Sequence, residues 1–415
     1  MRRRHFLQSS LPLLTGLPTL RSRGQEATAE TLPPVRQITR GPKFHWFGYY
    51  DKMQFDPTNR FVLSNEVDFE GRTPSAGDRI RVGMVDLEDG DRWTDLGKSD
   101  AWGWQQGCML QWRPGHGREV IWNDREDGQF VSHLLDTATG KQRTLPHPIY
   151  ALSPDGSFGV TADFSRIQRL RPGYGYQGVP DATAEVPRPE NSGVWRVNLD
   201  TGERTLLVSI AEIADHGRLP HEVPGSHHWF NHLLVSPDGK RLIFLHRWKI
   251  ENGRWLTRML TANASDGSDV RLIDDNGLTS HFIWRDPEQI LAWSKHADGP
   301  AFYVFEDAPA PDPKPIGLGV MTVDGHCTYL PKQDHQWVLC DTYPDKERKQ
   351  NPYLFSIATG KKHPLGHFYS PAPYAGEWRC DTHPRHSNDG RMAVIDSPHA
   401  GGRQLHLIDL SGMVG

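Results

Sequence analysis

One hydrophobic pattern recurs along the chain, and it is clearest in residues 230–246. An apolar run is followed by Ser-Pro-Asp-Gly at residues 236–239, and a second apolar run begins at Leu242. Short apolar runs rich in β-branched and aromatic residues predict strands, and Pro, Asp and Gly between them predict a hairpin turn. Similar patterns begin at six further positions, namely Asp51, Met109, Ile149, His281, His326 and His383.

A third strand follows most of these hairpins and ends near an Asp/Thr-Gly pair, as at residues 200–202 and 358–360. A fourth short strand then follows in most copies. Seven units of four strands predict an all-β fold, a seven-bladed β-propeller, rather than two β-sandwiches or a six-bladed ring. The last unit lacks a fourth strand, and residues 35–39 resemble the fourth strand at 270–274. We therefore expect residues 35–39 to pair with residues 404–410 and to close a single domain, residues 31–415.

The first 30 residues do not share this pattern. Arg3 and Arg4 are followed by Phe6 and Leu7, and a weak apolar stretch covers residues 11–20. Because this resembles a twin-arginine export signal, residues 1–30 are predicted to be a signal peptide and linker, and the mature protein to be periplasmic or secreted. No apolar run reaches the length of about 18 residues that a membrane span needs, so none is predicted.

Charge and cysteine content narrow the range of partners. The chain has 47 Lys and Arg against 51 Asp and Glu, and removal of the five leader arginines changes its net charge from −4 to −9. A body this acidic argues against nucleic-acid binding, which needs a basic surface. The four cysteines form no CxxC pair, which leaves both free thiols and one or two bridges open. A closed ring has no free edge strands, so we expect a monomer.

Four histidines hold the same position in successive repeats. His232, His281, His326 and His383 are 49, 45 and 57 residues apart, which is one blade each. The first strand of a blade lines the central channel, so these side chains are predicted to face one channel mouth. Converging imidazoles can hold a metal ion or perform acid–base chemistry, although a single strand histidine is most often structural. The other three repeats carry Asp51, Met109 and Ile149 at this position.

The loops expected on the same face are rich in Arg and Tyr. They include Arg125, Arg247, Tyr343 and Arg403, and a long loop at residues 165–192 adds further Arg and Tyr. Together they predict a cationic rim suited to an anionic oligosaccharide such as a uronate glycan, because arginine pairs bidentately with carboxylates. Four tryptophans could stack on sugar rings or pack between blades, namely Trp46, Trp102, Trp104 and Trp248.

The repeats and the histidine order resemble the oligogalacturonate lyase-like propellers, seven-bladed relatives of the TolB type. The resemblance implies His281 as the catalytic base and His326 as a ligand of a divalent metal one blade later. The family then has Gln-x-x-His-x-His, where this chain has Cys380, His383 and Arg385. His383 matches. Cys380 is a candidate ligand in place of Gln, and Arg385 a candidate for substrate binding in place of the last His. His232 is a further candidate ligand, and the metal is expected to be manganese or zinc, with sulfur favouring zinc.

The activity implied is β-elimination at a uronate. His281 would remove the proton next to the carboxylate, Arg247 or Arg403 would bind that carboxylate, and Tyr343 or water would protonate the leaving oxygen. Two alternatives stay open. One is a non-catalytic propeller that binds a glycan or protein. The other is a glycoside hydrolase, which needs a carboxyl pair. Candidate carboxyl groups are Asp51, Asp124, Asp341 and Asp396.

Overall fold

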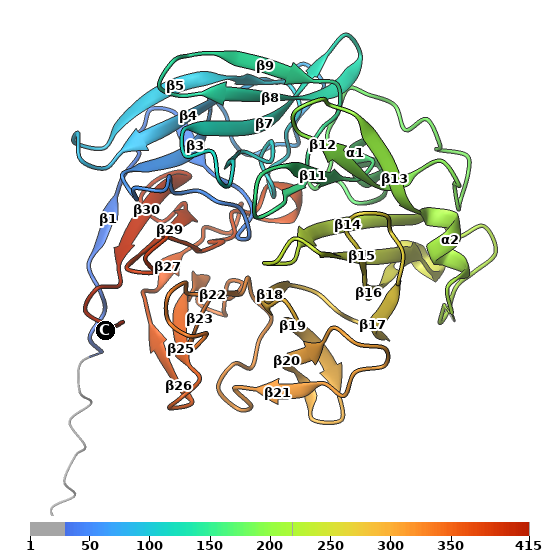
Figure 1. The fold of residues 1–415 in the computed structure, drawn as a ribbon. Helices are drawn as coiled ribbons and strands as arrows, with labels where there is room; N and C mark the ends of the chain where they lie inside the picture. The colour runs from blue at the N-terminus through green and yellow to red at the C-terminus, as the bar shows by residue number, and fades with distance from the viewer. Residues whose placement is uncertain (1–29, 218, 415) are drawn as a thin grey trace, which may run out of the picture. The chain divides into compact units, whose positions relative to one another are not determined.

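The structure is a computed structural model that describes residues 30–217 and 219–414. The chain divides into two units, Met1–Thr31 and Leu32–Gly415. Within the second unit, the described strands form seven four-stranded sheets arranged as the blades of a ring (Figure 1). The predicted seven-bladed β-propeller is therefore confirmed. The predicted signal peptide falls almost wholly on residues 1–29, outside the described residues, and stays a prediction.

In blades 1 to 3 the strands pair in chain order. Blade 1 contains β2 (Phe44–Trp46), β3 (Phe61–Val67), β4 (Ile80–Asp86) and β5 (Arg92–Ser99). Blade 2 contains β6 (Gln111–Trp112), β7 (Glu119–Glu126), β8 (Gln129–Asp136) and β9 (Gln142–Leu145). Blade 3 contains β10 (Ala151–Leu152), β11 (Phe158–Thr161), β12 (Gly193–Asn198) and β13 (Arg204–Ser209).

Blades 4 to 6 repeat this order. Blade 4 contains β14 (His228–Val235), β15 (Arg241–Lys249), β16 (Trp255–Asn263) and β17 (Arg271–Gly277). Blade 5 contains β18 (Phe282–Asp286), β19 (Gln289–His296), β20 (Gly299–Glu306) and β21 (Lys314–Ile316). Blade 6 contains β22 (Thr328–Tyr329), β23 (Trp337–Cys340), β25 (Tyr353–Ser356) and β26 (Lys361–Pro364).

Blade 7 joins the two ends of the ring. It contains β28 (Arg385–His386), β29 (Met392–Ser397), β30 (Gln404–Asp409) and, as its fourth strand, β1 (Val35–Gln37). Val35 pairs with Ile408 and Gln37 with His406, which confirms the predicted ring closure. Because the outermost strand of the last blade comes from the start of the domain, the ring is held shut by backbone hydrogen bonds between residues far apart in sequence.

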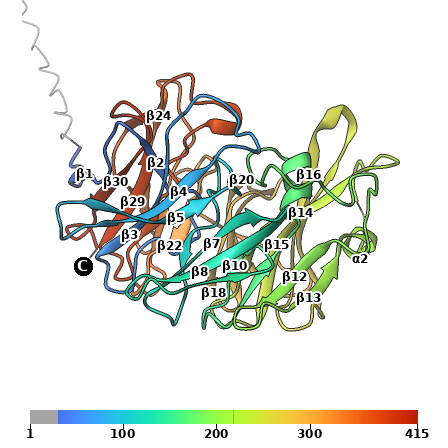
Figure 2. The ribbon, with the colours of Figure 1, turned by 90° about the horizontal axis from the view of Figure 1, so that it is seen from above.

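Short helices and one extra strand pair lie in the connections. The helices are α1 (Phe164–Leu170), α2 (Ile210–Asp215), η1 (Glu251–Gly253) and η2 (Gly376–Trp378), and β24 (Lys349–Gln350) pairs with β27 (Phe368–Tyr369). None of the helices in the described part of the chain is long and apolar enough to span a membrane. Seen from the side, the β15–β16 hairpin and β24 project from the same side of the ring (Figure 2). Both belong to connections between second and third strands, so these connections share one face, as the sequence predicts.

The Ser-Pro-Asp-Gly turn works through its side chains. In blade 4, Ser236 Oγ donates to Asp238 and accepts from the backbone N–H of Arg241, while Gly239 takes a φ of 77°. Only glycine adopts that left-handed conformation without steric cost, so the turn residues determine where each hairpin reverses.

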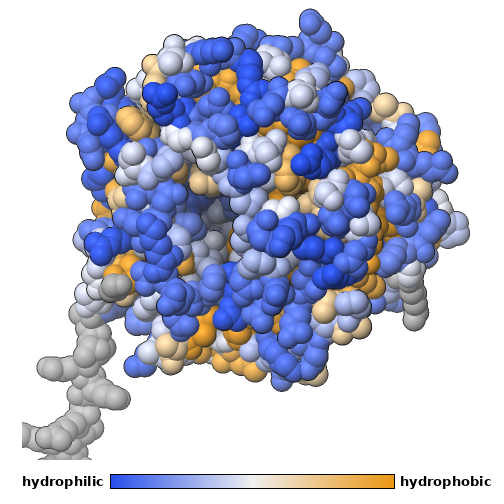
Figure 3. All heavy atoms as spheres, viewed as in Figure 1, coloured by the Kyte–Doolittle hydropathy of each residue, from blue (hydrophilic) through white to orange (hydrophobic). Residues whose placement is uncertain are grey.

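The core lies between neighbouring blades. Trp46, Trp102 and Trp104 pack together with ring centroids 5.5, 5.2 and 5.1 Å apart, and Trp248 Nε1 donates to a backbone carbonyl. All four are buried, so they serve packing and none presents a face to a sugar. The four cysteines are free and buried. At the middle of the ring the face shown in Figure 3 is hollowed and bordered mainly by hydrophilic residues.

Candidate functional site

Three of the four predicted histidines meet at the centre of the ring. The imidazole of His326 lies 4.2 Å from that of His281 and 4.1 Å from that of His383, measured between ring centroids. His281 immediately precedes β18, and His326 and His383 each stand two residues before the first strand of their blade. His232, within β14, stacks on Phe282 at 3.9 Å instead. The equal position in each blade thus brings imidazoles from blades 5, 6 and 7 together.

Two tyrosines that the sequence analysis did not single out lie among these imidazoles. Tyr49 contacts the rings of His232 and His383 at 4.9 and 5.3 Å, and Tyr50 contacts His326 at 5.3 Å. The Tyr50 hydroxyl donates to the carbonyl of Phe282 at 2.7 Å and accepts from its N–H at 3.0 Å. Blade 1 is therefore tied to blade 5 across the ring. The signal in the sequence was the position of the pair directly before Asp51.

The backbone is unusual at the position that the histidines share in the repeats. His232 and His383 have φ values of 53° and 39°, and Met109, which holds the same position in blade 2, has 56°. Non-glycine residues in this region cost on the order of 1–3 kcal/mol each and concentrate at functional sites. Contacts with neighbouring residues must hold the backbone in this conformation. It occurs at the level of the ring where the imidazoles come together.

Asp341 connects two of the histidines. One of its oxygens accepts from the backbone N–H and Nδ1 of His326, at 2.7 and 2.9 Å, and the other accepts from the N–H of His383 at 3.0 Å and from Thr382 Oγ1 at 2.6 Å. Burial opposes the charge of Asp341, but His326 and these donors hold its pKa below the usual value. The bond at Nδ1 leaves Nε2 of His326 as the nitrogen that can bind a ligand.

His326, Asp381 and His383 form a group that could hold a metal ion. One ligand atom from each lies within 4.8 Å of the others, and all three residues are buried. Nε2 of His383 is buried without a hydrogen-bond partner, and burial lowers the pKa of this histidine well below its usual value. A neutral imidazole nitrogen with no partner, facing a second imidazole and a carboxylate, fits a divalent cation.

Cys380 lies outside this group. Burial raises the pKa of its thiol, which keeps it protonated, and the charged groups acting on it are Arg403, Asp396, Glu70 and Asp381. The oxygen donor next to the two histidines is instead Asp381, which the sequence analysis passed over. The donor set lacks sulfur, so the preference for zinc over manganese loses its basis.

His281 and His232 each face a carboxylate. His281 Nδ1 lies 2.9 Å from Asp324 Oδ1, so an aspartate orients this imidazole and leaves Nε2 available. His232 Nε2 lies 3.3 Å from Asp51, which also pairs with Lys52 at 3.1 Å. Burial lowers the pKa of His232 to about 4 despite this partner, so it is neutral at pH 7. Like His326, His281 has an orienting acid and a free nitrogen, but unlike His326 it is not part of the group that could hold a metal ion.

Arg247 is a buried guanidinium without partners. Its side chain is only 7% exposed, and neither Nε nor Nη1 makes a hydrogen bond. Burial, with Arg171 nearby, lowers its pKa to about 9, and Tyr174 and Tyr49 act on it electrostatically. It therefore remains charged at pH 7 and lies within electrostatic range of the tyrosine that contacts His383. An unpaired buried cation of this kind is costly unless a ligand supplies the anion.

Arg379 and two tyrosines complete the mouth of the site. Arg379 donates to the Tyr174 hydroxyl at 2.8 Å and to Asp381 at 2.7 Å. Burial opposes ionisation of Tyr174, but Arg379 and Arg171 outweigh it and lower its pKa to about 7. Tyr343 is 36% exposed, and its ring lies 6.2 Å from that of His281. Burial of its hydroxyl, together with Asp381, raises the pKa of Tyr343 well above its usual value.

The remaining predicted rim arginines are used within the fold. Arg385 pairs with Asp396 at 2.7 Å and donates to Gln54, and Arg403 donates to Glu70 and to backbone carbonyls. Both are fully buried. Arg125 donates to the carbonyls of Ala76 and Gln177. Their donors are thus engaged by the protein itself, in contrast to those of Arg247.

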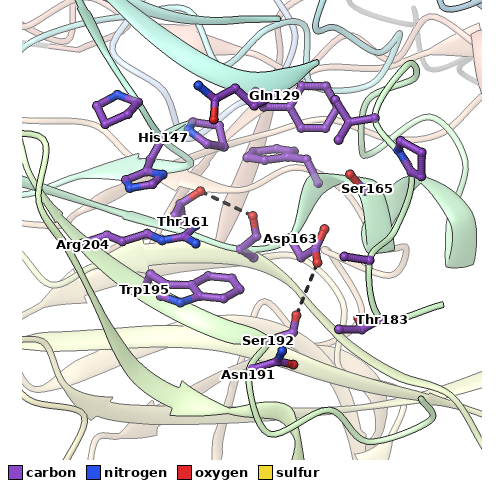
Figure 4. A pocket seen from close by; sticks show the side chains of 18 residues that line it. Gln129, His147, Thr161, Asp163, Ser165, Thr183, Asn191, Ser192, Trp195 and Arg204 are labelled. Carbon is purple, nitrogen blue, oxygen red and sulfur yellow. Dashed lines mark hydrogen bonds between the residues drawn. The ribbon is translucent and has the colours of Figure 1, made fainter. Parts of the chain in front are cut away.

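A separate cavity of about 410 Å³ lies beside blades 2 and 3 (Figure 4). Trp195, Arg204 and His147 lie on one side of it, and Asp163, which accepts from Ser192 at 3.5 Å, lies on another. None of the four predicted histidines lines it. It is therefore distinct from the site at the centre of the ring.

The fold and this site define a seven-bladed β-propeller with histidines and arginines at its centre. Two solved oligogalacturonate lyases are similar to it. The one from Vibrio parahaemolyticus is 14% identical, with 92% of this chain and 94% of that chain covered and a TM-score of 0.62. One solved in complex with manganese is 16% identical, with 91% and 93% covered and a TM-score of 0.64.

The tricorn protease is similar over 90% of this chain and 34% of its own, at 12% identity and a TM-score of 0.51. At these identities the likeness shows a shared fold alone. No model of a protein family and no curated protein sequence matches the chain.

Proposed function

We propose that this protein is a lyase that cleaves a uronate-containing oligosaccharide by β-elimination. The observation that carries the proposal is the buried guanidinium of Arg247, whose Nε and Nη1 have no hydrogen-bond partner. It lies within electrostatic range of Tyr49, which contacts the imidazole of His383. Such a site lacks one anion, and a sugar carboxylate supplies it. The similar lyase folds support the same chemistry, and one of those structures holds manganese.

The reaction follows from the groups present. Nε2 of His281 takes the proton from the carbon next to the carboxylate, the electron pair forms a double bond to the neighbouring carbon, and the glycosidic C–O bond breaks. Asp324 at 2.9 Å stabilises the imidazolium that results. Tyr343, whose raised pKa keeps its proton in place, or a water molecule then protonates the leaving oxygen.

The proton removed is weakly acidic, because it lies next to an ionised carboxylate. Arg247 offers two parallel donors to that carboxylate and stabilises the charge that builds up on it. A divalent cation held by His326, Asp381 and His383 would act as a Lewis acid toward the same carboxylate. The buried surroundings exclude water and strengthen both interactions.

A glycoside hydrolase is less well supported. Its mechanism needs two carboxyl groups placed on either side of the bond. Each of the four aspartates considered for that role is held by a neighbour. Asp51 pairs with Lys52, Asp124 with His133, Asp341 with His326 and Asp396 with Arg385.

The direct test is incubation of the full chain, loaded with Mn²⁺ or Zn²⁺, with a panel of uronate glycans. Elimination produces a carbon–carbon double bond conjugated to the carboxylate, which absorbs in the ultraviolet, whereas hydrolysis does not. Absorbance that rises with substrate and disappears in His281→Ala supports the proposal. Reducing ends released without absorbance indicate a hydrolase, and binding without turnover indicates a non-catalytic propeller.

The cellular location follows from the leader alone. We propose that the folded protein is exported through the twin-arginine route, because Arg3 and Arg4 precede Phe6 and Leu7 at the start of the chain. Replacement of both arginines by lysine should keep the protein in the cytoplasm, as measured by cell fractionation. Unchanged export of that variant would contradict the assignment.

A further inference from the structure

A row of unpaired cations extends from the site along the α1 loop and the β15–β16 hairpin. Arg171, at the end of α1, has a buried Nε without a partner. The ammonium group of Lys249, at the end of β15, makes one hydrogen bond, to the carbonyl of Gly253 at 3.3 Å. Arg171 lowers the pKa of both Arg247 and Lys249, so the three charges lie close together. No carboxylate is among the main groups that act on Arg247 or Lys249, and neither side chain forms an ion pair with a described residue.

Neighbouring cations in the same part of the fold are paired. Arg169, also on α1, pairs with Asp181 at 2.8 Å, and Arg379 pairs with Asp381 at 2.7 Å. The protein is acidic overall, so carboxylates are not scarce. Repulsion among three adjacent cations raises the free energy of the folded chain unless an anion neutralises them. The lack of acids here, beside arginines that have them, indicates a surface that accepts an anionic ligand.

An exposed aromatic ring covers these cations. Trp255, at the start of β16, is 37% exposed. The guanidinium of Arg171 lies between two rings, 4.3 Å from that of Tyr174 and 4.7 Å from that of Trp255, and Lys249 Nζ lies 5.1 Å from Trp255. Cation–π contacts of this kind order the guanidinium and leave its edge available for hydrogen bonds. An indole face next to cationic donors suits a sugar ring that carries a carboxylate.

We propose that Arg171, Lys249 and Trp255 form a second sugar subsite, which binds the carboxylate of the unit next to the one held by Arg247. This inference rests on the proposed function and adds a requirement to it. The preferred substrate carries carboxylates on two consecutive units, and a glycan with an isolated uronate binds through Arg247 alone. Trp255 packs against the ring, and Arg171 and Lys249 neutralise its charge.

The experiment compares a uronate monosaccharide with its disaccharide, for galacturonate, glucuronate and mannuronate. Binding is measured by calorimetry on the full chain in the His281→Ala background, which prevents turnover. Arg171→Ala should weaken binding of the disaccharide by roughly ten- to a hundredfold, which is the size expected for a charge-assisted hydrogen bond. The affinity for the monosaccharide should stay within about twofold of the parent value. Arg169→Ala, which removes a paired charge from the same helix, should change neither.

Two further measurements keep the test decisive if Arg171→Ala does not fold. Trp255→Ala should weaken binding of the disaccharide and not that of the monosaccharide. Added salt should reduce the affinity for the disaccharide more steeply than the affinity for the monosaccharide. Equal losses for both sugars, or no loss for either, would overturn the subsite while leaving the lyase proposal intact. A parent protein that binds none of these sugars, and shows no elimination on uronate glycans when unmutated, would overturn both.

Discussion

Replacement of Arg247 by methionine should stabilise the protein and abolish its activity. Burial lowers the pKa of this arginine from its usual value to about 9. A shift of that size corresponds to roughly 4–5 kcal/mol that disfavours the charged form in the folded state, at about 1.4 kcal/mol per pKa unit. Methionine keeps the aliphatic packing and removes the charge. We therefore expect a net gain on the order of 1–3 kcal/mol, seen in calorimetry as a melting temperature higher by a few degrees.

Arg166→Met is the matched control. Arg166 is also a buried arginine, but its donors reach the carbonyls of Thr183, Val186, Pro187 and His228. Its removal leaves these acceptors unsatisfied and should destabilise the protein by roughly 3–5 kcal/mol. The two substitutions are chemically the same, so opposite signs isolate the effect of the missing partner.

The gain in stability expected for Arg247→Met should decrease at high pH. Below about pH 9 the folded and unfolded states both carry the proton on Arg247, so the full penalty is present. Above pH 9 the folded protein loses that proton while the unfolded chain keeps it. Stability of the unmodified protein then rises with pH relative to the variant, and the difference between them narrows.

Activity completes the test. The variant should lose on the order of 10²- to 10³-fold in kcat/KM on a uronate glycan, as for the loss of one charge-stabilising donor. A uronate monosaccharide should raise the melting temperature of the parent protein and not that of the variant, because only the parent binds it. A variant that is destabilised like Arg166→Met, or that keeps its activity, would refute the assignment of an unpaired, substrate-binding guanidinium.

Three further outcomes are expected. His281→Ala should lose about 10²- to 10⁴-fold in elimination with unchanged metal content by elemental analysis, and metal lost on this substitution would mean that base and ligand are exchanged. His383→Ala should lose metal and activity together, because the only unpartnered buried imidazole nitrogen of the group is removed. Stability should fall as the pH drops from about 6.5 toward 4, since burial lowers the pKa of His228 and His232 to about 4 and the unfolded chain binds more protons in that window. Denaturant unfolding at several pH values measures this, and a flat profile would contradict it.

Much of the architecture could be predicted from local pattern. Alternating apolar runs and Ser-Pro-Asp-Gly turns encode strands and hairpins within a few residues, so seven copies predict seven blades without knowledge of their packing. The likeness of residues 35–39 to a fourth strand likewise predicts the pairing of Val35 with Ile408. The histidine cluster followed from the same argument, because a residue at one position in each repeat lies at one height in the ring.

Side-chain contacts between residues far apart in the sequence could not be predicted from these local patterns. The sequence offers Arg247, Arg385 and Arg403 as equivalent candidates, and only the fold shows that Asp396 and Glu70 hold the last two. Similarly, Tyr49 and Tyr50 reach the imidazoles because the segment after β2 crosses to the centre of the ring.

Cys380 and Asp381 illustrate the difference between what the sequence predicts and what only the tertiary structure shows. A motif comparison aligns Cys380 with the family's glutamine, but the two residues stand in a segment without regular structure, where no periodicity predicts which side chain faces the centre. In the folded protein the thiol of Cys380 is buried outside the group that could hold a metal ion, and Asp381 lies next to His326 and His383. The sequence by itself determined the blades, their closure and the height of the imidazoles, because these depend on local repeats. The tertiary structure alone decided which charges remain unpaired, because pairing depends on contacts between residues far apart along the chain.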